Sequence, residues 1–404
     1  MKRFLQSKQV LIIIPIALIL FIYFNQGNSL ASDSANKEEY KEEEVVMVEK
    51  VPTRMDTMVH QYDSILTALH HDESTVGAAV VVTCDGEIVY LKCYGIKEAE
   101  GYDSIDKNTV FRLASVSKPV TGVLAGILAN EQLINLDDRI IEFLPDFALK
   151  DSLSTGALSI RNILSHTSGL VPHAYDNLVE ADVPFHVIMD SLRRVNISAL
   201  PGILYGYQNV VFSLYDTIAA IKTGMTFEEL LREKVFVPLK MDNASSGFTS
   251  FAENQNKAMP HGRINGSYRV LPLNDRYYNT NPAAGINASI SDMGQFLTAL
   301  TNHDHLLLPA NVVDTVFTPQ VVSPLRRIYL RRWGPVESKY YGLGWRIIGY
   351  KGRQIAYHGG YVRGYRAEIA VCREDGIGIA YLTNSPGKVG SEVVPIFLDM
   401  YMDE

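Results

Sequence analysis

The sequence contains little cysteine: Cys84, Cys93 and Cys372 are the three cysteines among 404 residues. Three cysteines allow at most one internal disulfide, so a fold stapled by several disulfides is excluded. Their spacing matches no zinc motif. All three lie in strand-like stretches, where we expect small buried apolar side chains, although one disulfide among them stays open.

Positive charge is also scarce. Lys and Arg number 37 against 45 Asp and Glu, which gives a formal net charge of −8. Because binding to phosphates needs a surplus of basic side chains, this balance argues against a nucleic-acid partner. The remaining composition, 47% hydrophobic and 20% charged, is that of a globular protein.

Two patterns that define common hydrolases are missing. The chain has no Gly-x-Ser-x-Gly sequence, which disfavours an α/β-hydrolase. His303-Asp304-His305 has no further ligand at useful spacing, so we interpret it as a polar loop and disfavour a zinc hydrolase. The sequence therefore predicts neither a metal nor a cofactor.

The N-terminus is the first informative segment. Basic residues from Lys2 to Lys8 precede an unbroken apolar run from Val10 to Phe24, which is short for a membrane span. Ser29-Leu30-Ala31 places small residues where a signal peptidase cuts. We therefore favour a cleaved signal peptide over residues 1–31, with an N-terminal membrane anchor as the alternative. In both cases the remainder is exported to the periplasm or beyond the cell.

The acid-rich, polar stretch that follows predicts a linker over residues 32–54, and the remaining sequence predicts a catalytic domain over residues 55–404. Strand-like runs occur near both ends of this domain, and helical patterns occupy about residues 115–300. The expected strands are 76–83, 87–93, 341–350, 353–358, 366–373 and 376–384. The expected helices begin near Met55, Val120, Ser159, Thr226, Ser291 and Val389. We predict the α+β class, with an antiparallel sheet flanked by helices, built from both chain ends around a mostly helical insertion.

Ser115-Val116-Ser117-Lys118 is the first candidate for chemistry. On a helix, residues three apart share a face, so Lys118 can reach Ser115. Burial lowers the pKa of a lysine toward that of a usable base, and a serine needs such a base to become nucleophilic. The same spacing occurs at three less favourable places, of which one is in the linker, one in a polar stretch and one across a Pro-Gly turn: Ser34–Lys37, Ser104–Lys107 and Ser385–Lys388.

Two weaker signals follow Ser115 along the chain. Tyr207-Gln208-Asn209 offers a phenol that can handle protons and an amide that can hold a substrate amide. His358-Gly359-Gly360 ends an expected strand, and Tyr361 follows it. Paired glycines let a ligand approach the backbone closely, and a free N–H there suits an oxyanion hole. Taken singly, Tyr207 is more simply explained as a packing residue, and His358-Gly359-Gly360 as an ordinary turn at the end of a strand.

Together, the three elements resemble the serine β-lactamase and penicillin-binding-protein superfamily. The resemblance is greatest to its class C β-lactamase-related branch of esterases, D-aminopeptidases and DD-peptidases, and covers Met55 to the C-terminus. The stretches that carry it are 111–118, 164–169, 201–209, 236–241 and 284–293.

The resemblance implies roles for particular residues. Ser115 would be acylated, and Lys118 and Tyr207 would share general acid–base duty. Asn209 would bind the substrate. The backbone N–H groups of Ser115 and Tyr361 would form the oxyanion hole.

His358, Gly359 and Gly360 stand where many relatives have Lys-Thr-Gly. Lys118 and a partly charged His358 would both favour a tyrosinate at Tyr207. Replacement of that lysine by His358 implies weak β-lactamase activity at most.

Several other residues are weighed against these. The literal Lys222-Thr223-Gly224 precedes a helix and does not follow a C-terminal strand, so we interpret it as a coincidence. Arg363 is a hypothetical replacement for the lost lysine, with a solvated loop charge as the equal alternative. His166 is tempting as a base, but the resemblance places it in a structural turn.

We therefore expect a serine hydrolase that acts on a small-molecule or peptide ester or amide, such as that of a D-amino acid or cell-wall peptide. The alternative is a catalytically silent penicillin-binding or sensor module of the same fold. The intact Ser115, Lys118 and Tyr207 argue against that alternative.

Overall fold

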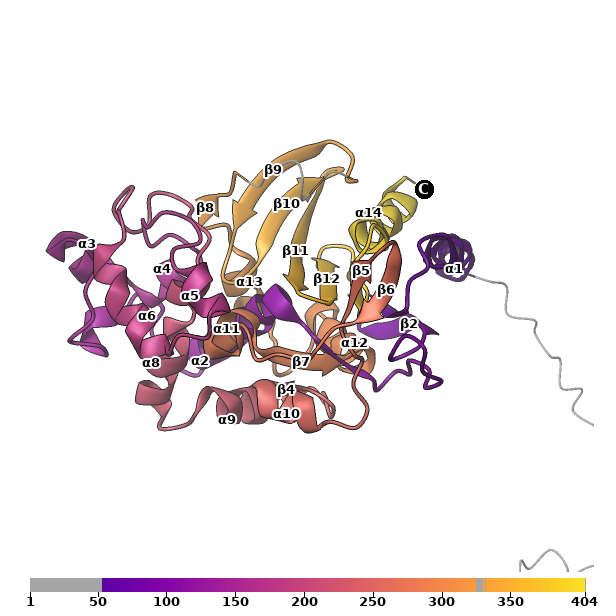
Figure 1. The fold of residues 1–404 in the computed structure, drawn as a ribbon. Coiled ribbons are helices and arrows are strands. Elements are labelled where there is room, and N and C mark those ends of the chain that lie inside the picture. The colour runs from indigo at the N-terminus through magenta and orange to yellow at the C-terminus, as the bar shows by residue number, and fades with distance from the viewer. Residues whose placement is uncertain (1–52, 325–329, 331, 404) are drawn as a thin grey trace, which may run out of the picture. The chain divides into compact units, whose positions relative to one another are not determined.

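An antiparallel sheet of eight strands forms the centre of the described chain (Figure 1). The computed structural model describes residues 53–324, 330 and 332–403. In spatial order the strands are β2 (Glu87–Gly95), β1 (Gly77–Cys84), β13 (Ile377–Thr383), β12 (Tyr365–Cys372), β11 (Arg353–Val362), β10 (Arg346–Tyr350), β9 (Val336–Tyr341) and β8 (Val321–Val322).

The two ends of the domain meet within this sheet, next to its β2 edge. β1 pairs with β13 from Ala78↔Thr383 to Cys84↔Ile377, and β1 also pairs with β2. β-Branched residues dominate β1, where Val80, Val81 and Val82 are fully buried, because both faces of this strand are covered. The predicted sheet built from both chain ends is confirmed.

One face of the sheet is covered by the helices nearest the two ends of the described chain. These are α1 (Arg54–Asp72) and α14 (Val389–Met402), which lie side by side (Figure 1). The buried Tyr62 hydroxyl donates to the carbonyl of Val393 at 2.9 Å, and Arg54 donates to the carbonyl of Tyr401. Thr53 caps α1 through a reciprocal capping box with Asp56, so the helix begins at a defined residue.

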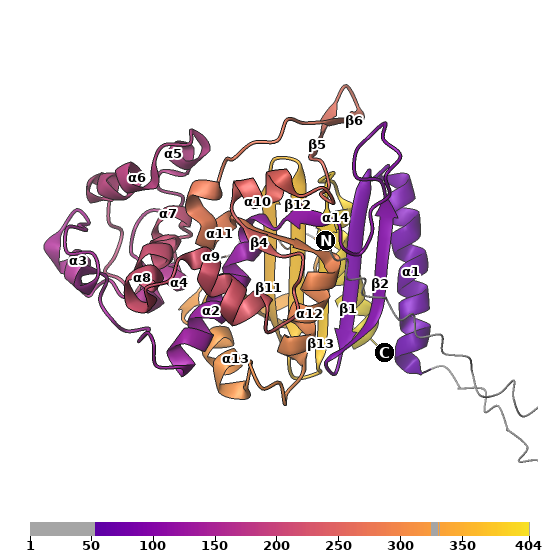
Figure 2. The same ribbon diagram turned by 90° about the horizontal axis from the view of Figure 1, so that it is seen from below.

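The opposite face carries the predicted, mostly helical insertion. Its larger helices α2, α12 and α13 contribute to a continuous apolar core with this face of the sheet. The helices between β2 and β9 are α2 (Ser117–Asn130), α3 (Ser152–Ala157), α4 (Ile160–Leu164), α5 (Asp176–Glu180), α6 (Phe185–Ser191), α7 (Asn209–Phe212), α8 (Leu214–Thr223), α9 (Phe227–Leu231), α10 (Phe248–Glu253), α11 (Asn281–Ala284), α12 (Ile290–Thr301) and α13 (Ala310–Phe317). In Figure 2, α3, α5, α6 and α8 gather at the end of the molecule opposite α1.

Short strands interrupt this region, and the sequence patterns missed them. β3 (Val110–Arg112), β7 (Ile286–Ser289) and β4 (Ser245–Ser246) form a small sheet, and β5 (His261–Ile264) pairs with β6 (Ser267–Val270). These strands have two to four residues each, which is too short for an alternating pattern to be visible.

Three predicted boundaries are wrong. The run 341–350 is not one strand: Tyr341 ends β9 and β10 begins only at Arg346, because Gly342 donates to the carbonyl of Trp345 and the chain reverses between the two strands. α12 is capped by Ser289, whose hydroxyl accepts from the N–H of Asp292, and not by Ser291. β11 continues past His358 to Val362.

All three cysteines are free thiols, so the described chain contains no disulfide among them. No helix among the described residues is both long and apolar enough to cross a membrane. The expected signal or anchor at residues 1–31 and nearly all of the expected acidic linker lie outside the described residues.

Gly344 is a position where the fold requires glycine. Its φ is +79°, and a Cβ there would lie 2.2 Å from the carbonyl oxygen of Lys118. We expect Gly344→Ala to lower the free energy of unfolding by about 2 kcal/mol or more, measured by urea denaturation. Gly156→Ala is the control, because Gly156 lies in a helix with nothing within 4 Å of an added Cβ, and it should leave stability unchanged or slightly raised. Equal effects of the two changes would contradict this account.

Candidate active site

Ser115 lies at the junction between the small sheet and a buried helix. β3 ends at Arg112, and Ala114 then adopts a left-handed conformation with φ +48°. A 3₁₀ turn over Ala114–Val116 leads directly into α2, whose residues from Ser117 to Leu128 are all buried. Ser115 is half-buried, in contrast to the fully buried residues that follow it in the helix. The strained residue before it is typical of a functional site.

Three side chains predicted from the sequence meet at this point. Tyr207 OH donates to Ser115 Oγ at 2.9 Å, and Lys118 Nζ lies 3.4 Å from the same oxygen. Lys118 Nζ also donates to Asn209 Oδ1 at 2.8 Å and to the carbonyl of Ala283 at 3.0 Å. The position of Lys118 Nζ is therefore fixed by contacts with α7 and α11 as well as by its own helix.

The environment of Lys118 suits a general base. It is fully buried, and burial lowers its pKa well below that of an ordinary lysine. The carboxylate of Asp176 opposes this shift, and the guanidinium of Arg346 adds to it. A lysine amine that is neutral near pH 7 has a lone pair and can accept the proton of Ser115.

Tyr207 behaves as a proton donor. Burial raises the pKa of its hydroxyl, and the nearby Arg346 guanidinium only partly opposes this. Arg346 lies 5.7 Å from the centre of the Tyr207 ring, and Lys118 Nζ lies 4.6 Å from it. The phenol is therefore protonated, which agrees with its hydrogen bond to Ser115. The expected tyrosinate is not what the structure favours.

Asn209 has both ends of its amide occupied. Its Oδ1 accepts from Lys118, and its Nδ2 donates to both oxygens of Asp176 at 3.1 Å. Lysine can only donate and a carboxylate can only accept, so the orientation of this amide is determined by its partners. Asp176 was not singled out from the sequence, where it is one of many surface-like acids.

His358 is buried and neutral. Burial and the charge of Arg346 lower its pKa well below that of an ordinary histidine, so the expectation of a partly charged ring is wrong. Arg346 Nη1 and Tyr341 OH both lie 3.1 Å from His358 Nε2. Because a guanidinium can only donate, Nε2 must accept, and the ring proton is on Nδ1, 2.9 Å from the carbonyl of Gly359.

Arg346 is the buried cation that sequence reasoning missed. It sits on β10 directly opposite Tyr357 of β11, close to His358. Arg363, the sequence-based candidate for this cation, lies exposed in the turn between β11 and β12, and its role stays a prediction. The only sign of its importance in the sequence was its positive charge within the otherwise uncharged run 341–350.

The edge of β11 closes the site on the other side of Ser115. Its pairing with β10 ends at Tyr357, so His358, Gly359, Gly360 and Tyr361 continue along an edge that β10 leaves open. A Cβ on Gly360 would lie 3.0 Å from the N–H nitrogen of Ser115 and 2.4 Å from the carbonyl of Leu113. Gly360 is therefore needed for close approach of two backbones inside a strand, and not for a turn at its end.

His166 lies beside this cluster but does not contact Ser115. Its ring is fully buried, 4.4 Å from the Tyr207 ring and 4.7 Å from the Tyr341 ring. Its Nδ1 accepts from the backbone N–H of Gln208 at 3.2 Å. This placement agrees with packing behind Tyr207.

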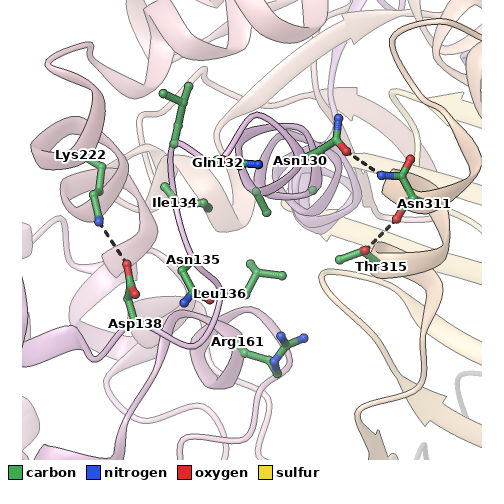
Figure 3. Close-up of a pocket in the computed structure, with 13 residues that line it drawn as sticks. Asn130, Gln132, Ile134, Asn135, Leu136, Asp138, Arg161, Lys222, Asn311 and Thr315 are labelled. Atoms are coloured by element: carbon green, nitrogen blue, oxygen red, sulfur yellow. Dashed lines mark hydrogen bonds and ion pairs between the residues drawn. The ribbon is translucent and has the colours of Figure 1, made fainter.

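The literal Lys222-Thr223-Gly224 lies elsewhere, as expected. It ends helix α8, and Gly224 has φ +72° as a C-terminal cap. Lys222 forms an ion pair with Asp138 at 3.1 Å in a groove of about 730 Å³ (Figure 3). None of the side chains around Ser115 lines this groove.

His303 and His305 also lie away from Ser115, in the loop after α12. Among the residues that the structure describes, no three His, Cys, Asp or Glu side chains are grouped as metal ligands.

The sequence matches the family model described as Beta-lactamase over residues 62–398. The chain belongs to the β-lactamase family. Curated relatives include the unguisins hydrolase ungD' of Aspergillus campestris, 24% identical over 80% of this chain, and penicillin-binding protein 4 of Amycolatopsis lactamdurans, 24% identical over 83% of this chain. The matches span 62% of the fungal hydrolase and 86% of the penicillin-binding protein.

A β-lactamase of Escherichia coli is 23% identical, with 74% of this chain and 72% of the relative aligned. Among solved structures, the octameric penicillin-binding protein homologue from Pyrococcus abyssi superposes with a TM-score of 0.74, 21% identity, and coverage of 86% and 78% of the two chains. The predicted resemblance is confirmed at the level of fold and of the hydrolase family.

The lowered pKa of Lys118 predicts how this β-lactamase-family site depends on pH. The free amine is present above its depressed pKa and is lost as the pH falls through it, whereas an ordinary lysine would be neutral only above about pH 10. We expect the rate of Ser115 phosphonylation by a neutral fluorophosphonate to fall as the pH is lowered through the depressed pKa of Lys118, and to reach its plateau well below the pH at which an ordinary lysine loses its proton. A rate that rises only above about pH 9 would contradict this assignment.

Proposed function

We propose that this protein is a serine hydrolase that forms an acyl-enzyme at Ser115 on an ester or amide, with at most weak β-lactamase activity. The observation that carries the proposal is the position of Ser115 Oγ between the hydroxyl of Tyr207 at 2.9 Å and the buried amine of Lys118 at 3.4 Å. One partner is suited to donate a proton and the other to accept one.

The proposed acylation follows from these protonation states. Lys118 takes the proton of Ser115 as Oγ attacks the substrate carbonyl carbon, and the backbone N–H groups of Ser115 and Tyr361 stabilise the oxyanion. Tyr207 gives its proton to the departing oxygen or nitrogen, and the proton held by Lys118 then restores Tyr207. In the second step a water molecule attacks the acyl-enzyme, the same proton transfers run in reverse, and the carboxylic acid is released.

The neutral His358 supports weak activity toward β-lactams. The lysine that relatives carry at this position offers a cation to the substrate, whereas His358 presents a neutral ring whose Nε2 is already occupied by Arg346 and Tyr341. A substrate carboxylate at this edge would therefore meet no directly exposed lysine charge. Esters and peptide-like amides without that carboxylate fit the site better.

Intact-mass spectrometry of the full chain tests the proposal. The protein is incubated with a fluorophosphonate and, separately, with penicillin, together with the variants Ser115→Ala and Ser104→Ala. We expect a fluorophosphonate adduct that disappears in Ser115→Ala and persists in Ser104→Ala, which removes the serine of the polar Ser104–Lys107 motif. Absence of any adduct with both reagents would overturn the hydrolase and favour the silent binding module.

We also propose export, carried by the apolar run from Val10 to Phe24 and the small residues Ser29 and Ala31. The N-terminal sequence of the protein from fractionated cells tests this. A mature chain that begins at Ser32 in the soluble exported fraction supports a cleaved signal. An uncut chain in the membrane fraction supports the anchor, and an uncut chain in the cytoplasm overturns export.

A further inference from the structure

Asp176 places a carboxylate inside the candidate active site. It is reached from Ser115 through three successive contacts: Ser115 Oγ to Lys118 Nζ, Lys118 Nζ to Asn209 Oδ1, and Asn209 Nδ2 to Asp176. The carboxylate is mostly buried, with 18% of its side chain exposed.

The loop holds this carboxylate firmly. His173 and Tyr175 both have left-handed backbones, with φ +59° and +63°, directly before α5 begins at Asp176. The N–H of His173 donates to the carbonyl of Tyr207 at 2.8 Å, which ties the loop to a proposed proton donor. Two strained residues within one short loop are costly, and strain of this kind clusters at functional sites.

The negative charge of Asp176 has no permanent cation beside it. Within the described part of the chain, neither Lys nor Arg forms an ion pair with Asp176. Its contacts are the neutral amide of Asn209 and the half-exposed ring of His173, which lies 2.8 Å away. Burial lowers the pKa of the Lys118 amine, which reaches Asp176 only through Asn209, so this amine is a weaker cation than an ordinary lysine. A mostly buried carboxylate in this state binds a cation favourably.

We propose that Asp176 is the specificity-determining residue of this site and pairs with an ammonium group in the acyl half of the substrate. The inference rests on the proposed acyl-enzyme at Ser115 and names its substrate class, esters or amides of compounds with a free amino group. In an α-amino-acid ester the ammonium stands on the carbon next to the carbonyl that Ser115 attacks. A charge in the acyl half therefore stays close to Ser115 and to the contacts that lead from Lys118 through Asn209 to Asp176.

A matched pair of substrates tests the inference. We would measure kcat/KM of the full chain for the p-nitrophenyl esters of D- and L-alanine and for their N-acetyl counterparts, which lack the positive charge. We expect the free-amine ester of at least one enantiomer to be preferred. Asp176→Asn should lower its kcat/KM by roughly ten- to a hundredfold, and change that of the N-acetyl ester less than about threefold.

Two comparisons separate recognition of charge from other effects. Asp190→Asn removes one negative charge from an exposed position on α6, and it should leave both substrates unchanged. A parallel loss on both esters in Asp176→Asn would overturn the inference, because it would show that Asp176 only positions Asn209.

The failure of this inference is distinct from the failure of the proposed function. Fluorophosphonate labelling of Ser115 with equal turnover of charged and capped esters would overturn only the role of Asp176. Absence of labelling in the unmodified protein would overturn the acyl-enzyme itself.

Discussion

Replacement of Lys118 by methionine is expected to lower the rate of Ser115 acylation by about 10⁴-fold or more. Methionine has nearly the same length and is tolerated in a buried position, but it has no lone pair that can accept the Ser115 proton at neutral pH. Lys118 is the one amine within 3.4 Å of Ser115 Oγ among the described residues. The loss should appear in kcat and in kcat/KM alike, because proton transfer occurs in the transition state.

The control for this change is Lys222→Met, which removes the lysine of the coincidental Lys222-Thr223-Gly224. It breaks an ion pair with Asp138 in the groove of Figure 3 and should change turnover less than about twofold. The thermal midpoint of both variants is measured, because Lys118→Met leaves Asn209 Oδ1 without its donor. Unchanged acylation in a folded Lys118→Met protein would show that the base is elsewhere.

Tyr207→Phe is expected to lower turnover by about 10²- to 10³-fold for a substrate whose leaving group needs a proton. The change removes the hydroxyl that donates to Ser115 Oγ and keeps the ring that packs on His166. A p-nitrophenolate departs without protonation, whereas an amine does not. The loss should therefore be much larger for an amide than for the p-nitrophenyl ester of the same acid.

Tyr268→Phe serves as the matched control, because it removes a hydroxyl that donates to the backbone carbonyls of Ser385 and Pro386. It should not alter the ratio of amide to ester turnover. Equal losses on amide and ester in Tyr207→Phe would show that the phenol acts on the attack by Ser115, and not on the leaving group.

Much of this site could be predicted because its chemistry is local in the sequence. Ser115 and Lys118 are three residues apart at the start of one apolar helix, so helical geometry alone brings them together. The alternating strands near both ends likewise predicted the sheet, because strands covered on one or both faces leave a clear hydrophobic pattern. Tyr207, Asn209 and His358 were identified only through the resemblance, since nothing in their immediate neighbourhood distinguishes them.

The residues that were missed depend on contacts distant in sequence. Arg346 becomes important only because β10 pairs with β11 and brings it to His358. Asp176 becomes important only because a strained loop turns it toward Asn209. The protonation states of Tyr207 and His358 were misjudged for the same reason: the burial that sets their pKa values is a property of the assembled site.

The pairing of β1 with β13 has a consequence for how the chain folds. Ala78 is hydrogen-bonded across the strands to the region of Thr383, about three hundred residues later, so the central sheet cannot close until nearly all of the chain is available. Contacts between residues so far apart in the sequence slow folding, because a large loop must close before the contacts form and stabilise the fold. During synthesis of the chain, one edge of β1 therefore stays without its partner strand until the residues of β13 have been added.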